Sequence, residues 1–243
     1  MKKIFNVQNL MILSIVIFAG SAIYNVFQIA NTPIVIEPFL DTIAKSRSHY
    51  ILALLQCCLG IVATVFPIIL KYKARIHIPS PILAFHVTFL ILAIFCGEVL
   101  DFYYHIPWWD KMLHFASGVA LGFLGLSLIG LLNKSRSIIS SIKPTFIAVY
   151  TFVFSLALSA IWEIYEFLAD FILGTNMQRH RIIHTDIDLV GQEALYDTML
   201  DLVFASVGAL IAAFIIYKLI QRKSKLVNNL QVKRFSKPLK SSR

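Results

Sequence analysis

The most prominent feature of the chain is a series of long apolar runs separated by short polar segments. Each run is long enough to cross a hydrocarbon core of about 30 Å, which needs about 20 helical residues. No alternation at strand spacing competes with this pattern. We therefore predict an all-α fold, a polytopic bundle of six transmembrane helices, at about residues 9–29, 49–70, 79–103, 112–132, 144–172 and 197–220.

Composition agrees with a membrane protein. Hydrophobic residues make up 58% of the chain, charged residues only 14%, and the mean hydropathy is +0.76. No repeat or low-complexity linker divides the chain, so we expect one membrane domain over residues 1–222 and a basic tail over 223–243. The first run could be a cleaved signal, but its continuation to about Ala30 favours an uncleaved anchor.

Positive charge predicts the orientation. The net charge is +9, and Lys and Arg gather at the N-terminus, within 71–75 and 134–143, and in the tail. The positive-inside rule places these segments in the cytoplasm, which gives an N-in/C-in topology. This distribution is typical of contact with anionic lipid. The expected partner is therefore the lipid bilayer, and we expect no nucleic acid.

Negative charge falls on the opposite side. All 13 Asp and Glu lie in external loops or at external helix ends in this topology. The loop acids are Glu37, Asp41, Asp186, Asp188 and Glu193. The helix-end acids are Glu98 and Asp101, then Asp110, then Glu163, Glu166 and Asp170, then Asp197 and Asp201. Four helices are thus expected to carry carboxylates to one depth, in the outer leaflet.

Each of these helices presents its polar groups on one side. Glu163, Glu166 and Asp170 share an arc of about 60° on a helical wheel, and Asp110 with His114, like Asp197 with Asp201, are i,i+4 pairs. Small residues continue the same faces deeper into the bilayer and predict close helix packing. The acids should therefore point into an outward-facing pocket of the bundle. The small residues are Gly118, Gly122, Ala205, Ala209, Ser155 and Ser159.

Converging carboxylates cannot all stay ionised unaided. Protons, basic side chains or a divalent cation could compensate them, and oxygen ligands with one imidazole suit Mg²⁺, Mn²⁺, Ca²⁺ or Zn²⁺. The candidate metal ligands are Glu163, Glu166, Asp170, Asp197, Asp201, Asp110 and His114. Candidate acids and bases for catalysis are Glu163, Glu166 and His114, and further candidate site residues are Glu98, Asp101, Lys111, Arg179 and Arg181.

Three ordered motifs carry a resemblance to a known family. "WWDKMLHFASGVALG", "WEIYEFLAD" and "YDTMLDLVFASVGALIA" resemble the YjdF-type bacterial inner-membrane family and, more distantly, the VanZ-like proteins, over about residues 95–215. The resemblance implies a multi-pass protein of the bacterial plasma membrane, in a family without a settled biochemical activity. VanZ-like members are linked with glycopeptide resistance and the cell envelope, but that family tends to have Asn where this chain has Asp201.

The leading expectation for function is a cation-supported site at the outer leaflet. A bound cation would polarise a phosphoryl or carbonyl oxygen while a carboxylate or His114 acts as general base, with a lipid-linked envelope molecule as substrate. One alternative is a proton- or ion-coupled transporter. Two others are an envelope scaffold that uses residues 173–196 and a purely structural network of buried acids. The Arg179–His184 stretch could cap a phosphate, complete a metal shell or be a solvated loop, and the pattern leaves the oligomeric state open.

Overall fold

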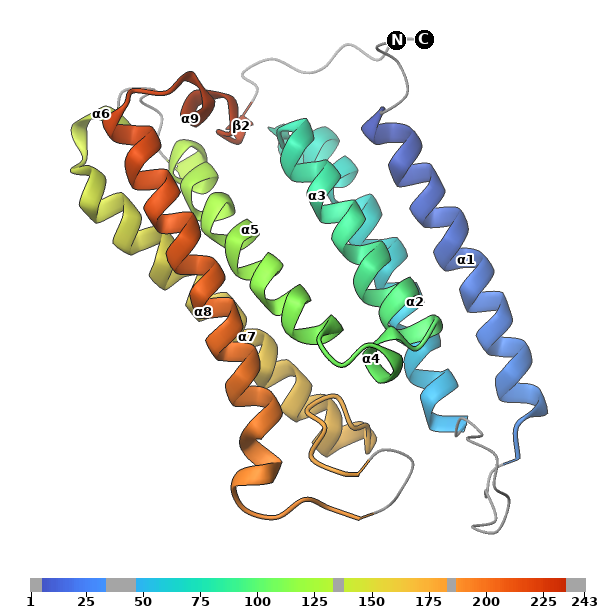
Figure 1. The fold of residues 1–243 in the computed structure, drawn as a ribbon. Helices are drawn as coiled ribbons and strands as arrows, with labels where there is room; N and C mark the ends of the chain where they lie inside the picture. The colour runs from blue at the N-terminus through green and yellow to red at the C-terminus, as the bar shows by residue number, and fades with distance from the viewer. Residues whose placement is uncertain (1–5, 34–46, 133–137, 183–186, 235–243) are drawn as a thin grey trace, which may run out of the picture.

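The computed structural model describes residues 6–33, 47–132, 138–182 and 187–234, and it is all-helical apart from two short strands (Figure 1). Six helices of the described part are long and apolar enough to cross a membrane, which confirms the predicted fold class. The long helices are α1 (Val7–Asn31), α2 (Arg47–Ile69), α3 (Ser80–Leu90), α5 (Trp109–Leu132), α7 (Pro144–Leu173) and α8 (Gln192–Gln221). Two π-helices, η1 (Leu70–Ala74) and η2 (Ile91–Val99), continue α2 and α3. The short elements are α4 (Phe102–His105), α6 (Ile138–Ser141), α9 (Lys225–Asn229), β1 (Ile76–His77) and β2 (Lys233–Arg234).

The long helices form two sets of three. Helices α5, α7 and α8 pack against one another, and α1 packs mainly on α2, with α3 and η2 beside them (Figure 1). The two sets meet chiefly where α5 contacts α3 and η2. We call them the C-terminal set and the N-terminal set.

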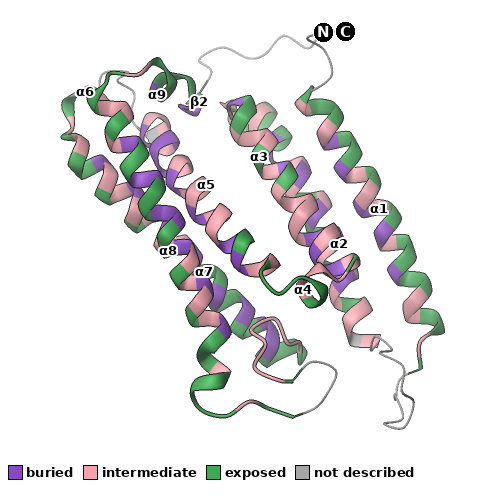
Figure 2. Ribbon diagram, in the orientation of Figure 1, coloured by how far each residue is buried: buried purple, intermediate pink, exposed green. Residues whose placement is uncertain are grey.

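Glycines bring the backbones of α5 and α8 together. A Cβ added at Gly118 would lie 2.2 Å from the Ala205 carbonyl oxygen, and one at Gly208 would lie 2.2 Å from the Phe115 carbonyl oxygen. From α7, the Ser155 hydroxyl donates to the Gly118 carbonyl at 2.8 Å. The expected close packing along these small-residue faces is therefore confirmed, and Figure 2 shows buried positions on these three helices.

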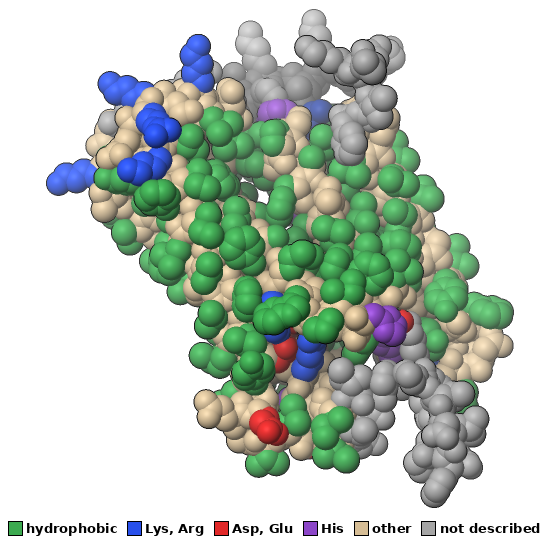
Figure 3. All heavy atoms as spheres, in the orientation of Figure 1, with side chains coloured by type: hydrophobic (Ala, Val, Ile, Leu, Met, Phe, Trp, Pro, Cys, Tyr) green, Lys and Arg blue, Asp and Glu red, His purple; other side chains and the backbone are tan. Residues whose placement is uncertain are grey.

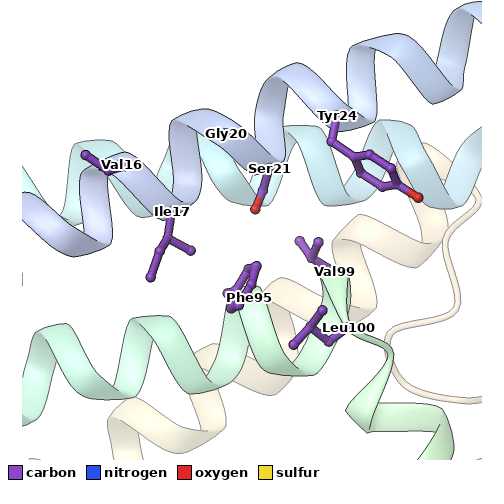
Figure 4. A pocket seen from close by; sticks show the side chains of 8 residues that line it. All are labelled: Val16, Ile17, Gly20, Ser21, Tyr24, Phe95, Val99 and Leu100. Atoms are coloured by element: carbon purple, nitrogen blue, oxygen red, sulfur yellow. The ribbon is translucent and has the colours of Figure 1, made fainter.

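Buried side chains fill the interior of the N-terminal set. Phe18, Cys57 and Ile94 form its buried core, and the hydroxyls of Ser14 and Thr64 lie 3.0 Å apart between α1 and α2. An apolar groove of about 440 Å³ remains between α1 and η2. Figure 4 shows its lining, which consists of Val16, Ile17, Gly20, Ser21, Tyr24, Phe95, Val99 and Leu100.

The third membrane helix ends earlier than predicted. It was expected to continue to residue 103, but η2 ends at Val99 and Asp101 adopts a left-handed φ of 59°. The turn places the Tyr103 ring against Gly97, where an added Cβ would lie 2.4 Å from the Tyr103 ring. A larger residue at 97 would displace that ring, so Gly97 allows the sharp turn into α4. The last helix also differs from the prediction, because it begins at Gln192 and not at residue 197.

The chain folds back after α8. The Val232 amide donates to the Ser127 carbonyl at 3.4 Å, and Gln231 Nε2 donates to the Leu126 carbonyl, also at 3.4 Å. Strand β2 then pairs antiparallel with β1. This end of the molecule is opposite the loops that carry the acids.

Charge is separated along the long axis of the molecule. Every described Asp and Glu lies at or near the end formed by the last turns of η2 and α7 and the first turns of α5 and α8, which we call the acid end. On the face in Figure 3, Asp and Glu appear only toward this lower end, whereas Lys and Arg gather mostly at the upper end and also lie beside acidic side chains lower down. Glu37, Asp41, Asp186, His184 and residues 235–243 of the expected tail lie outside the described residues. The N-in/C-in orientation, the single-domain assignment and the uncleaved anchor stay predictions.

Candidate functional site

A buried lysine lies among carboxylates at the acid end of the C-terminal set. Lys111, in the first turn of α5, is 5% exposed. Its Nζ donates to Asp197 Oδ1 at 2.5 Å and to Asp201 Oδ2 at 2.9 Å, both on α8, and lies 3.3 Å from Asp110 Oδ2. Breaking such a buried pair leaves an uncompensated charge, which is costly. Lys111 therefore ties α5 to α8 and neutralises part of the surrounding negative charge.

The His114 ring lies between oxygens from three helices. Its Nε2 is 3.6 Å from Asp110 Oδ1 and 3.7 Å from Asp201 Oδ1, and its Nδ1 is 3.7 Å from Glu163 Oε1 on α7. These separations exceed the 2.7–3.2 Å of an N–H···O hydrogen bond. The ring thus faces three carboxylates without being hydrogen-bonded to them. We call Asp110, Lys111, His114, Glu163, Asp197 and Asp201 the carboxylate cluster.

Several buried oxygens of the cluster receive no hydrogen bond from the described residues. They are Asp201 Oδ1, Asp197 Oδ2 and both Glu163 carboxylate oxygens. Thr198 is close enough to interact with Glu163, but no hydrogen bond forms in this arrangement. Asp201 is only 1% exposed. Because buried polar atoms are normally paired, these oxygens mark a position where a proton, water or cation is needed.

Asp110, His114 and Asp201 have the geometry of a metal-binding group. Each offers one ligand atom, and these atoms lie within 4.8 Å of one another. Atoms with this spacing surround a point up to about 2.8 Å from each, which is longer than the bonds of about 2.0–2.2 Å that Zn²⁺ and Mg²⁺ form with nitrogen and oxygen. Two carboxylates and one imidazole can therefore hold a divalent cation after small side-chain movements. Three protein ligands would leave further positions open for water or substrate.

Two predicted ligands on α7 are engaged elsewhere. Glu166 Oε1 accepts a hydrogen bond of 2.9 Å from Trp162 Nε1, within the same helix. Asp170 accepts from the Thr175 hydroxyl at 2.6 Å and from the backbone amides of Met177 and Gln178 at 2.7 and 2.9 Å. Asp170 thus caps the loop after α7. Its carboxylate organises the backbone there and has no contact with His114 among the described ion pairs.

The loop held by Asp170 places Arg179 over the cluster. Arg179 Nη2 donates to the Tyr103 carbonyl at 3.1 Å and lies 3.5 Å from Asp110 Oδ2, while Nη1 lies 3.8 Å from Asp197 Oδ1. Burial lowers the pKa of Arg179, but Asp110 and Asp197 raise it by more. The guanidinium therefore stays charged. Arg181, in contrast, pairs with the exposed Asp188 at 3.0 Å and does not reach the cluster.

The N-terminal set has its own polar group at the acid end. His49, at the start of α2, lies 3.6 Å from Glu98 Oε1 and 3.5 Å from Asp101 Oδ1. The His49 ring also lies 6.1 Å from the Tyr104 ring. Burial, with a smaller effect of Glu98, raises the pKa of Tyr104 to about 12, so its phenol stays neutral. Glu98 and Asp101 thus gather around His49 and not around His114.

The structure brings some of the predicted site residues together and separates others. The cluster combines Asp110, Lys111, His114, Glu163, Asp197 and Asp201, with Arg179 above it. Sequence reasoning missed His49, although the predicted topology places the start of the second helix at the acid end. It also left the place of Lys111 open, although Lys111 lies three residues before His114 and hence on the same helical face.

The fold and this buried group define a multi-pass membrane protein with an Asp/His/Asp group at one end of its bundle. Residues 10–222 match the model of a family described as predicted membrane protein (DUF2238), and the chain belongs to this family. The chain is also 34% identical over 122 residues to an uncharacterized protein of Thermotoga maritima, a match that covers 50% of this chain and 54% of that protein. The chain thus spans about half the length of this curated relative. No solved structure matches the chain.

Proposed function

We propose that the carboxylate cluster binds a divalent cation and uses it in a hydrolysis or transfer reaction on a lipid-linked molecule at the outer leaflet of the bacterial plasma membrane. The single observation that carries the proposal is Asp201 Oδ1, which is buried 3.7 Å from His114 Nε2 and receives no hydrogen bond from the described residues. A buried carboxylate oxygen without a donor is costly. A cation at this point would remove that cost. The YjdF-type and VanZ-like resemblance is consistent with this location and with an envelope substrate.

The charge balance of the cluster supports a divalent cation. Asp110, Asp197, Asp201 and Glu163 supply four carboxylates, whereas Lys111 and Arg179 supply two positive charges. Two negative charges remain when all groups are ionised. One divalent cation would neutralise them, and oxygen ligands with one imidazole suit Mg²⁺, Mn²⁺ or Zn²⁺.

The contacts support different roles for His114 and Glu163 in this proposal. His114 Nε2 faces Asp110 and Asp201 and would bind the cation, while Nδ1 faces Glu163. A carboxylate on the second ring nitrogen orients a metal-bound histidine, so Glu163 would hold the ring. The cation would polarise the substrate oxygen and lower the pKa of a bound water. The second carboxylate oxygen of Glu163, Oε2, receives no hydrogen bond from the described residues and would take up the proton of that water.

The distribution of ionisable residues favours this proposal over proton-coupled transport. From the cluster toward the end of the molecule away from the acids, α5 and α7 contain no Asp, Glu, His, Lys or Arg, and α8 contains none before Lys218. His86, on α3, lies 3.2 Å from the Ala63 carbonyl, which is on the neighbouring helix α2. A relay of titratable groups would need carriers along the bundle, and the described part of the C-terminal set has none there.

The proposal is tested by measuring metal in purified protein after incubation with Mg²⁺, Mn²⁺ and Zn²⁺ and removal of free ions. Wild type should retain about one divalent ion, and Asp201→Asn and His114→Gln should lose it. Asp188→Asn is the matched control, because Asp188 is an exposed acid paired with Arg181. Monodisperse elution in detergent shows that the variants fold. A wild type without metal under all three conditions contradicts the proposal.

A further inference from the structure

Arg179 occupies the rim of the carboxylate cluster. Its side chain is 23% exposed, whereas that of Lys111 is 6% exposed. The guanidinium has one hydrogen bond among the described residues, to the Tyr103 carbonyl. Its ion pairs with Asp110 and Asp197, at 3.5 and 3.8 Å, are longer than hydrogen bonds. An arginine side chain has five N–H donors, so most of the Arg179 donors are not used in hydrogen bonds with the described residues. We call this more exposed side of the cluster, at Arg179, the mouth of the cluster.

The backbone at Arg179 is held in an uncommon conformation. Its φ is 50°, in the left-handed region that few residues other than glycine adopt. Such strain persists only where the surroundings enforce it, and it concentrates at ligand clamps. Here the surroundings are well defined, because Asp170 binds two amides of the loop, and Asn176 pairs with both the amide and the carbonyl of Arg181 at 3.0 Å. The loop therefore presents Arg179 in one orientation.

A side-chain hydrogen bond also ties the loop that carries Arg179 to α8. Gln178 Nε2 donates to the Thr198 hydroxyl at 2.9 Å. Thr198 lies between the two cluster aspartates of α8 in sequence. The residue before Arg179 is thus tied to the helix that carries Asp197 and Asp201. Any group bound to the cation would lie close to the free donors of Arg179.

From these observations we infer that Arg179 binds a phosphoryl group at the mouth of the carboxylate cluster, which names the substrate class of the proposed cation site. The inference rests on the proposed function. A planar guanidinium binds phosphate oxygens in a bidentate manner. A phosphoryl group between Arg179 and the cation would be contacted by both, and Asp170 is the positioning residue that holds the loop in place.

The surroundings of the mouth favour a lipid phosphate. Large apolar side chains are exposed around this end of the molecule, among them Trp108, Ile187, Val190 and Tyr196. Figure 3 shows acidic and basic side chains side by side toward the lower end of this face, surrounded by hydrophobic ones. Exposed aromatic and aliphatic residues at a helix end are typical of the membrane interface, where lipid headgroups carry their phosphates.

The test compares Arg179→Gln and Arg179→Lys with Arg181→Gln, a control in the same loop whose partner is the exposed Asp188. The probes are inorganic phosphate added to protein in phosphatidylcholine nanodiscs, and phosphatidic acid built into such nanodiscs, both with Mn²⁺. Loss of a charge-assisted bidentate contact should weaken binding about tenfold or more in Arg179→Gln. Arg179→Lys should recover only part of it, and Arg181→Gln should stay within about twofold.

The two probes identify the source of the phosphate. Tighter binding of phosphatidic acid than of inorganic phosphate assigns the subsite to a lipid headgroup, and the reverse order assigns it to a soluble phosphate. Equal effects of the Arg179 and Arg181 variants, or no binding of either probe, overturn the inference. Bound Mn²⁺, measured by its electron paramagnetic resonance signal, is followed separately. Mn²⁺ should persist in Arg179→Gln, whereas a wild type without Mn²⁺ refutes the proposed function and leaves an Arg179-dependent phosphate site standing.

Discussion

The two sets of helices use different means to pack in the same membrane. In the C-terminal set, glycines bring α5 and α8 into backbone contact, and the acid ends of these helices carry the carboxylate cluster. In the N-terminal set, Phe18 and Ile94 fill the interior, and an apolar groove stays open between α1 and η2. Close backbone approach thus accompanies the polar site in this molecule. Helices held this near to each other can place charged groups from three elements around one histidine.

The largest expected effect comes from adding one methyl group at the α5–α8 contact. Gly118→Ala places a Cβ against the Ala205 carbonyl and should lower the free energy of unfolding by about 1–3 kcal/mol. The matched variant Gly20→Ala, in α1, meets nothing within 4 Å and should be neutral or slightly stabilising. Thermal unfolding in detergent measures both. Equal shifts would show that close approach is not what distinguishes the two sets.

Removal of the central lysine should have an effect of similar or slightly smaller size. Lys111→Met leaves Asp197 and Asp201 buried without their donor. Breaking a buried ion pair costs about 3–5 kcal/mol while the charge persists. Protonation of an aspartate reduces this to the cost of an unsatisfied buried polar group, about 1–3 kcal/mol. Arg181→Met breaks an exposed pair and should cost less than about 1 kcal/mol. The double variant Lys111→Met/Asp201→Asn should recover part of the loss. Chemical unfolding in mixed micelles distinguishes these outcomes, and no recovery in the double variant would refute direct pairing.

The histidine of the N-terminal set provides a smaller effect. His49→Ala removes the contacts with Glu98 and Asp101 and should cost about 1–2 kcal/mol. Metal content should not change, because His49 is not part of the carboxylate cluster. Thermal unfolding and metal analysis of the same sample test both parts. A loss of metal in His49→Ala would mean that the two polar groups act as one site.

The smallest expected effect is on the hydroxyl pair between α1 and α2. Ser14→Ala removes the 3.0 Å contact with Thr64, which also donates to the Gly60 carbonyl within its own helix. Interhelical hydrogen bonds in membranes contribute about 0.6 kcal/mol on average. A loss near that value, measured by thermal unfolding, is expected. A loss above about 2 kcal/mol would show that polar contacts dominate in the N-terminal set as well.

Helical periodicity was sufficient to predict which faces would meet. The spacing of Asp110 and His114, and the small residues Gly118 and Ala205 deeper on the same faces, predicted that these faces point into the bundle and pack closely. The structure packs the two small-residue faces against each other. Apolar run length predicted all six membrane helices. These features depend on local spacing, which one sequence records directly.

The partners of individual charged side chains could not be predicted from spacing along the sequence, because loops and helix rotation determine them. Asp170 lies on the same arc as Glu163, but the turn at Gly174 brings two backbone amides onto its carboxylate. Lys111 was one of several candidate partners, and only the packing of α8 on α5 places its Nζ between Asp197 and Asp201. Similarly, the end of η2 directs Glu98 and Asp101 to His49. Such pairings depend on distances between elements that no spacing along one chain encodes.

The antiparallel pair of β1 and β2 brings two segments that are far apart in the sequence together. It joins the connection after α2 to the segment that follows α8, at the end away from the acids. Hydropathy alone assigns no structural role to residues 225–234, yet these residues connect the two sets of helices. Truncation before Lys225 would remove the pairing of β2 with β1. The two sets would then be held together by the contacts of α5 with α3 and η2 and by the hydrogen bond from Arg179 to Tyr103.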